Sequence, residues 1–222
     1  MRGRFITFEG GEGTGKSSHA KLLAQRLRSH GLDVVLTREP GGSPGAEVMR
    51  HVILSGAVKP LGPGAEAILF AAARDDHLNE VIRPALERGA WVICDRFADS
   101  TRVYQGILGG ADPDLIRALE RIVVGRDQPD LTLVLDVPAE LGLQRAAKRR
   151  GSAAVDRFEE EAIEFHADLR EAFLKLAAEE PRRCVVIDTT IPRHEVADLI
   201  WATVQERLHP MEALDVQRTA AS

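Results

Sequence analysis

Several residue types that would mark other classes of protein are scarce in this sequence. Its 222 residues include two cysteines and one tyrosine, and only 5% are aromatic. Two separated cysteines make neither a disulfide framework nor a metal site. Cys94 and Cys184 lie in apolar runs, so we expect buried, reduced thiols in a cytoplasmic protein. No apolar run approaches membrane-spanning length, and the net charge of −5 argues against broad nucleic-acid binding.

The sequence also lacks internal repeats and low-complexity segments. A strand-like run begins within a few residues of Met1, which leaves no room for a signal peptide. The length fits one α/β domain. We therefore expect a single domain over residues 1–209, followed by a disordered tail over residues 210–222.

Residues 10–17 match the phosphate-loop pattern G-x-x-x-x-G-K-[ST] at every fixed position. A strand-like run precedes them, and a helical pattern over residues 17–28 follows. The glycines allow backbone N–H groups to surround a phosphate, and the helix N-terminus adds partial positive charge. The alternative is a glycine-rich turn with an exposed lysine, which explains neither the strand-like run before it nor the helical pattern after it. The predicted nucleotide-binding residues here are Gly10, Gly11, Glu12, Gly13, Thr14, Gly15, Lys16, Ser17 and Ser18.

Apolar runs alternate with helical patterns along the rest of the chain. The expected strands are residues 4–9, 34–37, 91–94, 131–136 and 184–188. The expected helices are residues 17–28, 45–55, 63–88, 112–124, 138–150, 159–180 and 195–208, with Pro84 bending the third. Residues 97–110 are expected to form a loop with a short helix. This alternation predicts an α/β fold with a five-stranded parallel sheet flanked by helices.

Two charged residues, Asp95 and Arg96, end the third expected strand. Ligands of open α/β sheets bind at the carboxyl ends of strands. Asp95 therefore suits a Mg²⁺ shell shared with the Ser17 hydroxyl, with Lys16 on the β- and γ-phosphates. An aspartate here could equally cap a helix, but the adjacent arginine favours the functional interpretation.

Further motifs make the chain resemble the bacterial thymidylate kinases. They are Arg-Glu-Pro-Gly-Gly at 38–42, Phe-Ala-Ala-Ala-Arg at 70–74, Asp-Arg-Phe at 95–97, Ser-Thr at 100–101, Tyr-Gln-Gly at 104–106 and a basic segment before Asp156. The resemblance implies the phosphate-loop nucleoside monophosphate kinase fold and ATP-dependent phosphorylation of dTMP to dTDP with Mg²⁺, for dTTP synthesis. It also implies a homodimer, for which residues 65–78 and 112–124 are candidate surfaces.

The resemblance also implies roles for residues around the acceptor nucleotide. Phe70 would stack on thymine, and Arg74, on the same helical face, would donate to its O4. Thr101 and Gln105 would lie near base and sugar, and Tyr104 under the deoxyribose. The alternatives are core packing for Phe70, an ordinary half-buried aromatic for Tyr104 and a solvated helix charge for Arg74. The implied substrate-binding set is Glu12, Arg38, Phe70, Arg74, Arg96, Ser100, Thr101, Tyr104 and Gln105.

Arg38 and Arg96 would hold the acceptor phosphate, because guanidinium groups bind phosphates in a bidentate manner. Glu12 occupies the loop position where the family carries a carboxylate near the sugar 3′-hydroxyl and this phosphate. No strong general base is needed, because the acceptor is already an anionic oxygen. We therefore expect catalysis by positioning and charge neutralisation.

The phosphate loop lacks an arginine between Gly11 and Thr14. Relatives of this type supply the charge from a lid, which we expect at about residues 145–158, with a hinge at 151–154. Either Arg149 or Arg150 would reach the transferred phosphoryl, and Arg145 would flank adenine. The alternative is a solvated helix end whose cations offset the helix dipole. The predicted catalytic set is Glu12, Lys16, Arg96, Arg149 and Arg150.

Two other functions remain to be weighed against this one. Another nucleotide or nucleoside kinase would share the phosphate loop, but Phe70, Arg74 and Tyr104 suit a keto base on a deoxyribose. A GTP-binding switch would carry Asn-Lys-x-Asp. The only asparagine is Asn79, and Glu80 follows it, so this motif is absent.

Overall fold

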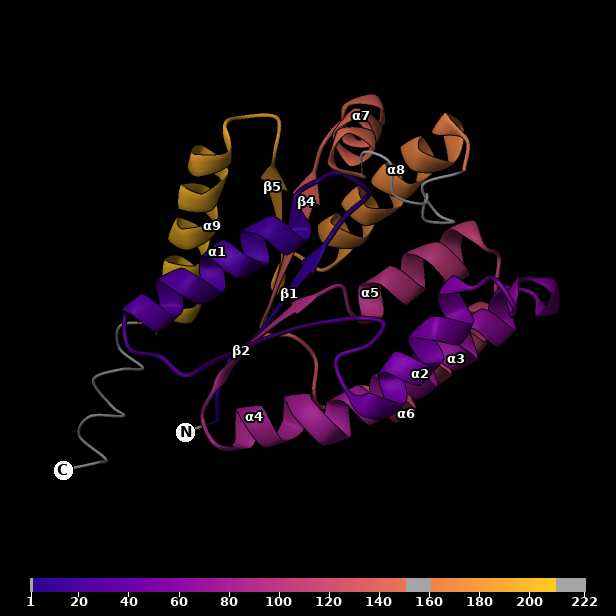
Figure 1. Ribbon diagram of the computed structural model, residues 1–222, viewed down its shortest axis with the longest axis horizontal. Coiled ribbons are helices and arrows are strands. Elements are labelled where there is room, and N and C mark those ends of the chain that lie inside the picture. The colour runs from indigo at the N-terminus through magenta and orange to yellow at the C-terminus, as the bar shows by residue number, and fades with distance from the viewer. Residues whose placement is uncertain (1, 151–160, 211–222) are drawn as a thin grey trace.

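The computed structural model describes residues 2–150 and 161–210 (Figure 1). The predicted hinge at 151–154 lies outside the described residues, and so do residues 211–222 of the tail predicted over 210–222. One parallel sheet runs through the molecule in the order β2-β3-β1-β4-β5. Its strands are β1 (Phe5–Glu9), β2 (Val34–Arg38), β3 (Trp91–Asp95), β4 (Leu131–Asp136) and β5 (Cys184–Asp188). The prediction of five parallel strands is confirmed.

Helices cover both faces of this sheet (Figure 1). The α-helices are α1 (Lys16–Ser29), α2 (Pro44–Leu54), α3 (Pro63–His77), α4 (Arg83–Glu87), α5 (Ala98–Thr101), α6 (Pro113–Val123), α7 (Ala139–Arg150), α8 (Ile163–Glu179) and α9 (Arg193–Leu208). A 3₁₀ turn, η1 (Lys59–Leu61), and two π-helical segments, η2 (Leu78–Ile82) and η3 (Arg102–Leu108), complete them.

Three apolar clusters hold the layers together. Helices α1 and α9 pack on one face, where Leu27, Trp201 and Phe8 belong to one buried cluster. Helices α3, α4 and α6 lie against β1 and β3 on the other face, and α8 and η3 lie against β4. Because β1 and β4 are covered on both sides, almost all of their side chains are buried, and most of them are apolar. This arrangement brings the carboxyl ends of β1, β2, β3 and β4 to one edge of the molecule.

The predicted helix over residues 63–88 is present, but a π-helical segment interrupts it. Helix α3 runs into η2, which leads into α4 with Pro84 at its start. Proline has no N–H to donate, so the wider turn before it accommodates the missing hydrogen bond. Gly89, with a φ of 88°, ends the helix as predicted.

Residues 97–110 are more helical than we predicted, because α5 and η3 fill most of this range. The buried carboxylate of Glu9 accepts hydrogen bonds from the backbone N–H groups of Phe97 and Ser100, at 2.7 and 3.2 Å. These bonds satisfy the backbone N–H donors at the start of α5. Their acceptor lies on β1, which is far away in sequence. The local pattern therefore could not reveal it.

The helix predicted over 159–180 begins later, at Ile163, because Glu161 and Ala162 are not helical. By contrast, the predicted cap at Asp112 is confirmed, since its carboxylate accepts from the N–H of Asp114 at 2.8 Å. Among the described residues, none of the helices combines the length and the apolar character needed to cross a membrane.

Candidate functional site

The phosphate loop joins β1 to α1 and lies at the carboxyl edge of the sheet. The buried Lys16 ammonium folds over the loop and donates to the carbonyls of Gly10 and Gly11, at 3.0 and 2.5 Å. Burial, reinforced by the nearby Arg96, lowers the pKa of Lys16 to about 8. The loop thus holds a cation close to backbone N–H groups, as phosphate binding requires.

The loop backbone is packed directly against helix α7. A Cβ atom added at Gly13 would lie 1.8 Å from the carbonyl oxygen of Gly142, and Gly13 has a φ of 68°. A Cβ added at Gly142 would lie 2.5 Å from the carbonyl oxygen of Glu12. Both positions therefore need glycine, for contact and at Gly13 also for conformation. The contact ties the loop to the helix that carries Arg145 and Arg149.

An ion pair joins this loop to β3. Arg96 donates from Nη2 to Glu12 Oε1 at 2.5 Å, and its guanidinium lies over the Tyr104 ring, 5.2 Å from the ring centre. The Tyr104 hydroxyl donates to the same oxygen at 3.2 Å. Burial alone would raise the pKa of Glu12, but Arg96, Lys16 and the Tyr104 hydroxyl together lower it to about 2. Glu12 is therefore ionised at neutral pH.

Ser17 and Asp95 meet where α1 begins and β3 ends. The Ser17 hydroxyl donates to the Asp95 carboxylate. Hydroxyl and carboxylate oxygens are the donors that Mg²⁺ prefers, and it usually takes only one or two carboxylates alongside substrate phosphates. The described residues contain no cluster of three or more His, Cys, Asp or Glu side chains that could hold a metal. The pair therefore fits a cation that is shared with a bound nucleotide.

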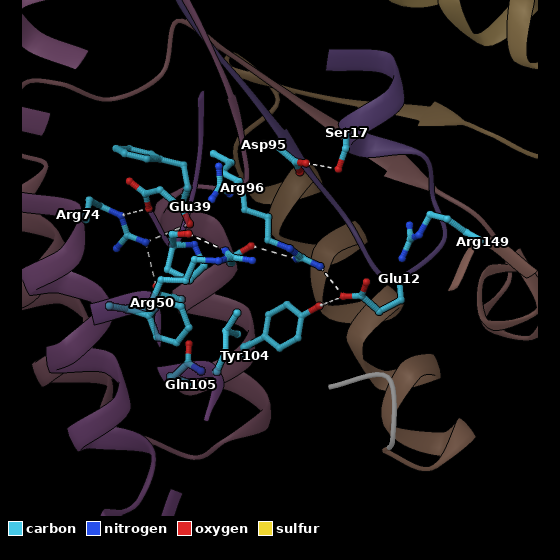
Figure 2. A pocket seen from close by; sticks show the side chains of 17 residues that line it. Glu12, Ser17, Glu39, Arg50, Arg74, Asp95, Arg96, Tyr104, Gln105 and Arg149 are labelled. Carbon is cyan, nitrogen blue, oxygen red and sulfur yellow. Dashed lines mark hydrogen bonds and ion pairs between the residues drawn. The ribbon is translucent and has the colours of Figure 1, made fainter. Parts of the chain in front are cut away.

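A pocket of about 250 Å³ opens beside the loop. Figure 2 shows Arg74 and Glu39 at one end of it and Glu12 and Arg149 at the other. Every residue of the predicted substrate-binding set lines this pocket: Glu12, Arg38, Phe70, Arg74, Arg96, Ser100, Thr101, Tyr104 and Gln105. The fold therefore brings together residues from five separate segments of the chain.

The Arg74 end is buried and tightly paired. Arg74 donates from Nε to Glu39 Oε2 at 2.8 Å, and from Nη2 to the Phe97 carbonyl at 3.2 Å and to Thr101 Oγ1 at 3.1 Å. Only 5% of each side chain in the Arg74–Glu39 pair is exposed. Sequence reasoning missed Glu39, although it lies within the Arg-Glu-Pro-Gly-Gly motif.

Exposed and partly exposed cations also line the pocket. Arg38 pairs with Glu47 at 2.9 Å, and about half of its side chain is exposed. Arg149 lines the pocket from α7, while the side chain of Arg150 lies outside the described residues. Arg50, which donates to the Pro40 carbonyl at 2.6 Å, also lines the pocket and was missed by sequence reasoning.

Two further residues, Arg145 and Glu9, are not among those that line the pocket. Arg145 donates to the carbonyl of Thr189 at 2.9 Å, which puts it beside the loop after β5. Glu9, also missed from sequence, is fully buried behind the pocket and accepts from the Ser100 hydroxyl at 2.7 Å. Burial and the nearby Asp99 raise the pKa of Glu9 to about 7. Glu9 organises Ser100, whereas Glu12 faces the pocket.

Comparison with known proteins gives consistent results. Residues 8–200 match the family model described as thymidylate kinase. The thymidylate kinase of Bradyrhizobium sp. (strain ORS 278) is 62% identical over 207 residues, covering 93% of this chain and 92% of the relative. That of Bradyrhizobium diazoefficiens is 60% identical over 212 residues, covering 96% and 93%. The crystal structure of thymidylate kinase from Ehrlichia chaffeensis superposes with a TM-score of 0.75 at 32% identity, covering 92% of this chain and all of that one.

Proposed function

The chain belongs to the thymidylate kinase family, and we propose that its pocket binds dTMP with the base at the Arg74 end and the phosphate at the Glu12 end. The enzyme transfers the γ-phosphoryl group of ATP to dTMP, giving dTDP and ADP. One observation carries the binding mode: a single pocket has buried, fixed donors at one end and arginines beside a phosphate loop at the other.

The base end suits a thymine ring. Phe70 supplies an aromatic face, and the Arg74 guanidinium supplies donors for the O4 carbonyl. Thr101 and Gln105 add polar groups at the same end. A ring with an amino group at this position would present N–H groups to an arginine that can only donate. This mismatch disfavours cytosine.

The sugar lies between Tyr104 and Glu12 in the proposed mode. The Tyr104 ring is clamped by Arg96 and by its own hydrogen bond to Glu12, so it cannot move aside without breaking two contacts. A rigid ring here leaves little room for a 2′-hydroxyl. The ionised Glu12 carboxylate is an acceptor for the 3′-hydroxyl.

Phosphoryl transfer uses the other cations of the pocket and of the phosphate loop. Arg38, Arg50 and Arg96 hold the acceptor phosphate, and Lys16 moves from the loop carbonyls to the β- and γ-phosphates of ATP. Arg149 or Arg150 neutralises charge on the transferred group, and Arg145 flanks adenine. The acceptor is an anion, so positioning and charge neutralisation supply the catalysis.

We further propose that Ser17 and Asp95 hold Mg²⁺ together with the phosphates of ATP. The ion would screen phosphate charge during transfer. The lid over residues 145–158 and a cytoplasmic location stay predictions.

A homodimer is proposed from exposed apolar side chains on neighbouring helices. Val48 and Val52 on α2, Ile68 on α3 and Ile122 on α6 are all exposed, and α3 packs against both other helices. Buried between two copies, this surface would leave water. We expect Ile68→Glu to give a monomer in light scattering. The matched control Leu199→Glu, on α9, should stay dimeric.

The test of the proposed function is a panel assay. The purified protein is incubated with Mg-ATP and dTMP, dUMP, dCMP, dGMP, UMP or AMP, and ADP formation is followed. We expect fast turnover of dTMP, weak turnover of dUMP and almost none of the others. Preference for another monophosphate would overturn the proposed binding mode while leaving the fold unaffected. Binding of nucleotides without turnover of any acceptor would argue against a kinase.

A further inference from the structure

Behind Arg74 lies a chain of hydrogen-bonded side chains that starts at the partly buried Thr37 on β2 and continues through buried groups. Thr37 Oγ1 is 2.7 Å from His77 Nε2, His77 Nδ1 is 3.2 Å from Glu39 Oε1, and Glu39 Oε2 accepts from Arg74 Nε at 2.8 Å. His77 is fully buried, and only 5% of Glu39 and of Arg74 is exposed. We call these three contacts the Thr37–Arg74 relay.

The chemistry of the groups orients this relay. A carboxylate only accepts, so His77 Nδ1 carries the proton that goes to Glu39. In the neutral ring, Nε2 then accepts from the Thr37 hydroxyl. Glu39 thus accepts a hydrogen bond from His77 with one oxygen and from Arg74 with the other. Because both oxygens are held, the carboxylate cannot rotate without losing a contact.

The guanidinium of Arg74 is consequently held at two of its three nitrogens. Nε is bound by Glu39, and Nη2 by the Phe97 carbonyl and Thr101 Oγ1. Within the described residues, Nη1 donates to no protein acceptor. Since Arg74 lines the pocket, Nη1 is the nitrogen left for a ligand. Its direction depends on Glu39, and therefore on His77.

We propose that Glu39 and His77 are positioning residues that aim Nη1 of Arg74 at a keto oxygen of the pyrimidine, and so set the preference for a keto over an amino base. This inference rests on the proposed function, in which Arg74 reads the base. Neither Glu39 nor His77 donates to the substrate in this account. Their effect reaches the base only through the orientation of Arg74.

The segment that carries Glu39 is itself shaped around this relay. A Cβ atom added at Gly42, where φ is +92°, would lie 2.4 Å from His77 Nε2 and 2.5 Å from Thr37 Oγ1. The chain after β2 therefore folds directly over the histidine–threonine pair. A second contact, from Ser43 to Asp76 at 2.6 Å, holds the same segment to α3 without touching Arg74. It offers a matched control.

The experiment compares Glu39→Gln with a pair of His77 variants. An asparagine at position 77 places an amide near Nδ1 and can still donate to Glu39, whereas a glutamine reaches the Nε2 position and bonds Thr37 instead. Both His77 variants replace the buried imidazole with a primary amide. The readouts are kcat and KM for dTMP, dCMP and ATP, with thermal melting as a check on folding.

We expect Glu39→Gln and His77→Gln to lower the dTMP-to-dCMP ratio of kcat/KM by about tenfold or more, mainly through KM for dTMP, because a small misalignment of a binding group is costly. His77→Asn should retain most of the ratio. KM for ATP should change less than about twofold, since the relay does not touch the phosphate loop. Asp76→Asn should leave the ratio unchanged even if it lowers the melting temperature.

Equal losses of melting temperature with an unchanged ratio in Glu39→Gln and His77→Gln would overturn the proposal, because the relay would then serve packing alone. An equal fall in the ratio for Asp76→Asn would also overturn it. Arg74→Lys distinguishes base reading by Arg74 from the positioning of Arg74 by Glu39 and His77. If it leaves the ratio intact, base reading by Arg74 fails together with the relay. If it lowers the ratio while the relay variants do not, only the relay fails.

Discussion

The two ends of the pocket differ in how their arginines are held. At the base end, Arg74 is buried and has three contacts to protein acceptors. At the phosphate end, Arg96 is also held, by Glu12 and against the Tyr104 ring, but Arg38 is half exposed and Arg149 is exposed on α7. A neutral carbonyl is read by direction, so its donor must be fixed before the base arrives. A phosphoryl group is stabilised by charge, so its cations can close over two bound nucleotides.

The contrast is between side chains, because the backbone is fixed at both ends. Gly13 and Gly142 clamp the phosphate loop to α7, just as Gly42 fits the turn after β2 over His77. Backbone rigidity at the phosphate end positions the N–H groups, and the long side chains then adapt. The following predictions, ordered by expected effect, test this division.

The largest effect is expected from Lys16→Met. Removal of this cation should lower kcat by about 10³-fold or more, because charge neutralisation is the main catalytic contribution in phosphoryl transfer. Binding of dTMP alone, measured by calorimetry, should weaken much less, because the base end keeps all its contacts. An equal loss of dTMP affinity would show that the two ends are not separable.

Arginines on α7 should differ strongly from one another. We expect one of Arg149→Ala and Arg150→Ala to lower kcat by about 10²- to 10³-fold, and the other by less than about tenfold, as for a single arginine on the transferred phosphoryl. Lys148→Ala, on the same exposed helix end, is the matched control and should have little effect. Equal mild losses for both arginines would contradict a single catalytic arginine.

The pKa of Lys16, lowered to about 8 by burial, predicts a pH effect confined to the phosphate end. Below that pH the ammonium is protonated, so kcat/KM for ATP should fall as the pH rises through about 8. In Lys16→Arg this fall in kcat/KM should shift to higher pH, because a guanidinium stays charged. Affinity for dTMP should follow a flatter profile. If kcat/KM of Lys16→Arg still falls near pH 8, the titrating group is not Lys16.

The smallest effect is expected from Tyr104→Phe. It removes the hydroxyl that donates to Glu12 but keeps the ring beneath Arg96. A single hydrogen bond to a group that retains a stronger partner should cost about two- to tenfold in kcat/KM for dTMP. Discrimination against the ribonucleotide counterpart of dTMP, which carries a 2′-hydroxyl, should persist, because it depends on the Tyr104 ring. A large loss of discrimination would assign that role to the hydroxyl instead.

Much of the fold was predictable because its signals are local. The five strands were found from short apolar runs, and the Asp112 cap and Gly89 stop from single residues next to a helix end. Residues 97–110 were mispredicted because the donors at the start of α5 are satisfied by Glu9 on β1. The late start of α8 at Ile163 has no local signal that we could identify.

The resemblance to the thymidylate kinases implied nine substrate-binding residues, and all nine line the pocket. The partners of those residues were missed. Glu39 stands 35 positions from Arg74, and no period in the sequence connects them. His77 does share the helical face of Phe70 and Arg74, which was an available signal.

The sequence by itself determined the phosphate loop, the alternation of strands and helices and the chemistry at the sheet's carboxyl edge, because glycine spacing and apolar periodicity act within a few residues. Only the tertiary structure decided which carboxylate accompanies which arginine. Glu12 pairs with Arg96, and Glu39 pairs with Arg74. A buried charge requires a partner within a few ångströms, and packing between distant elements decides which one is there.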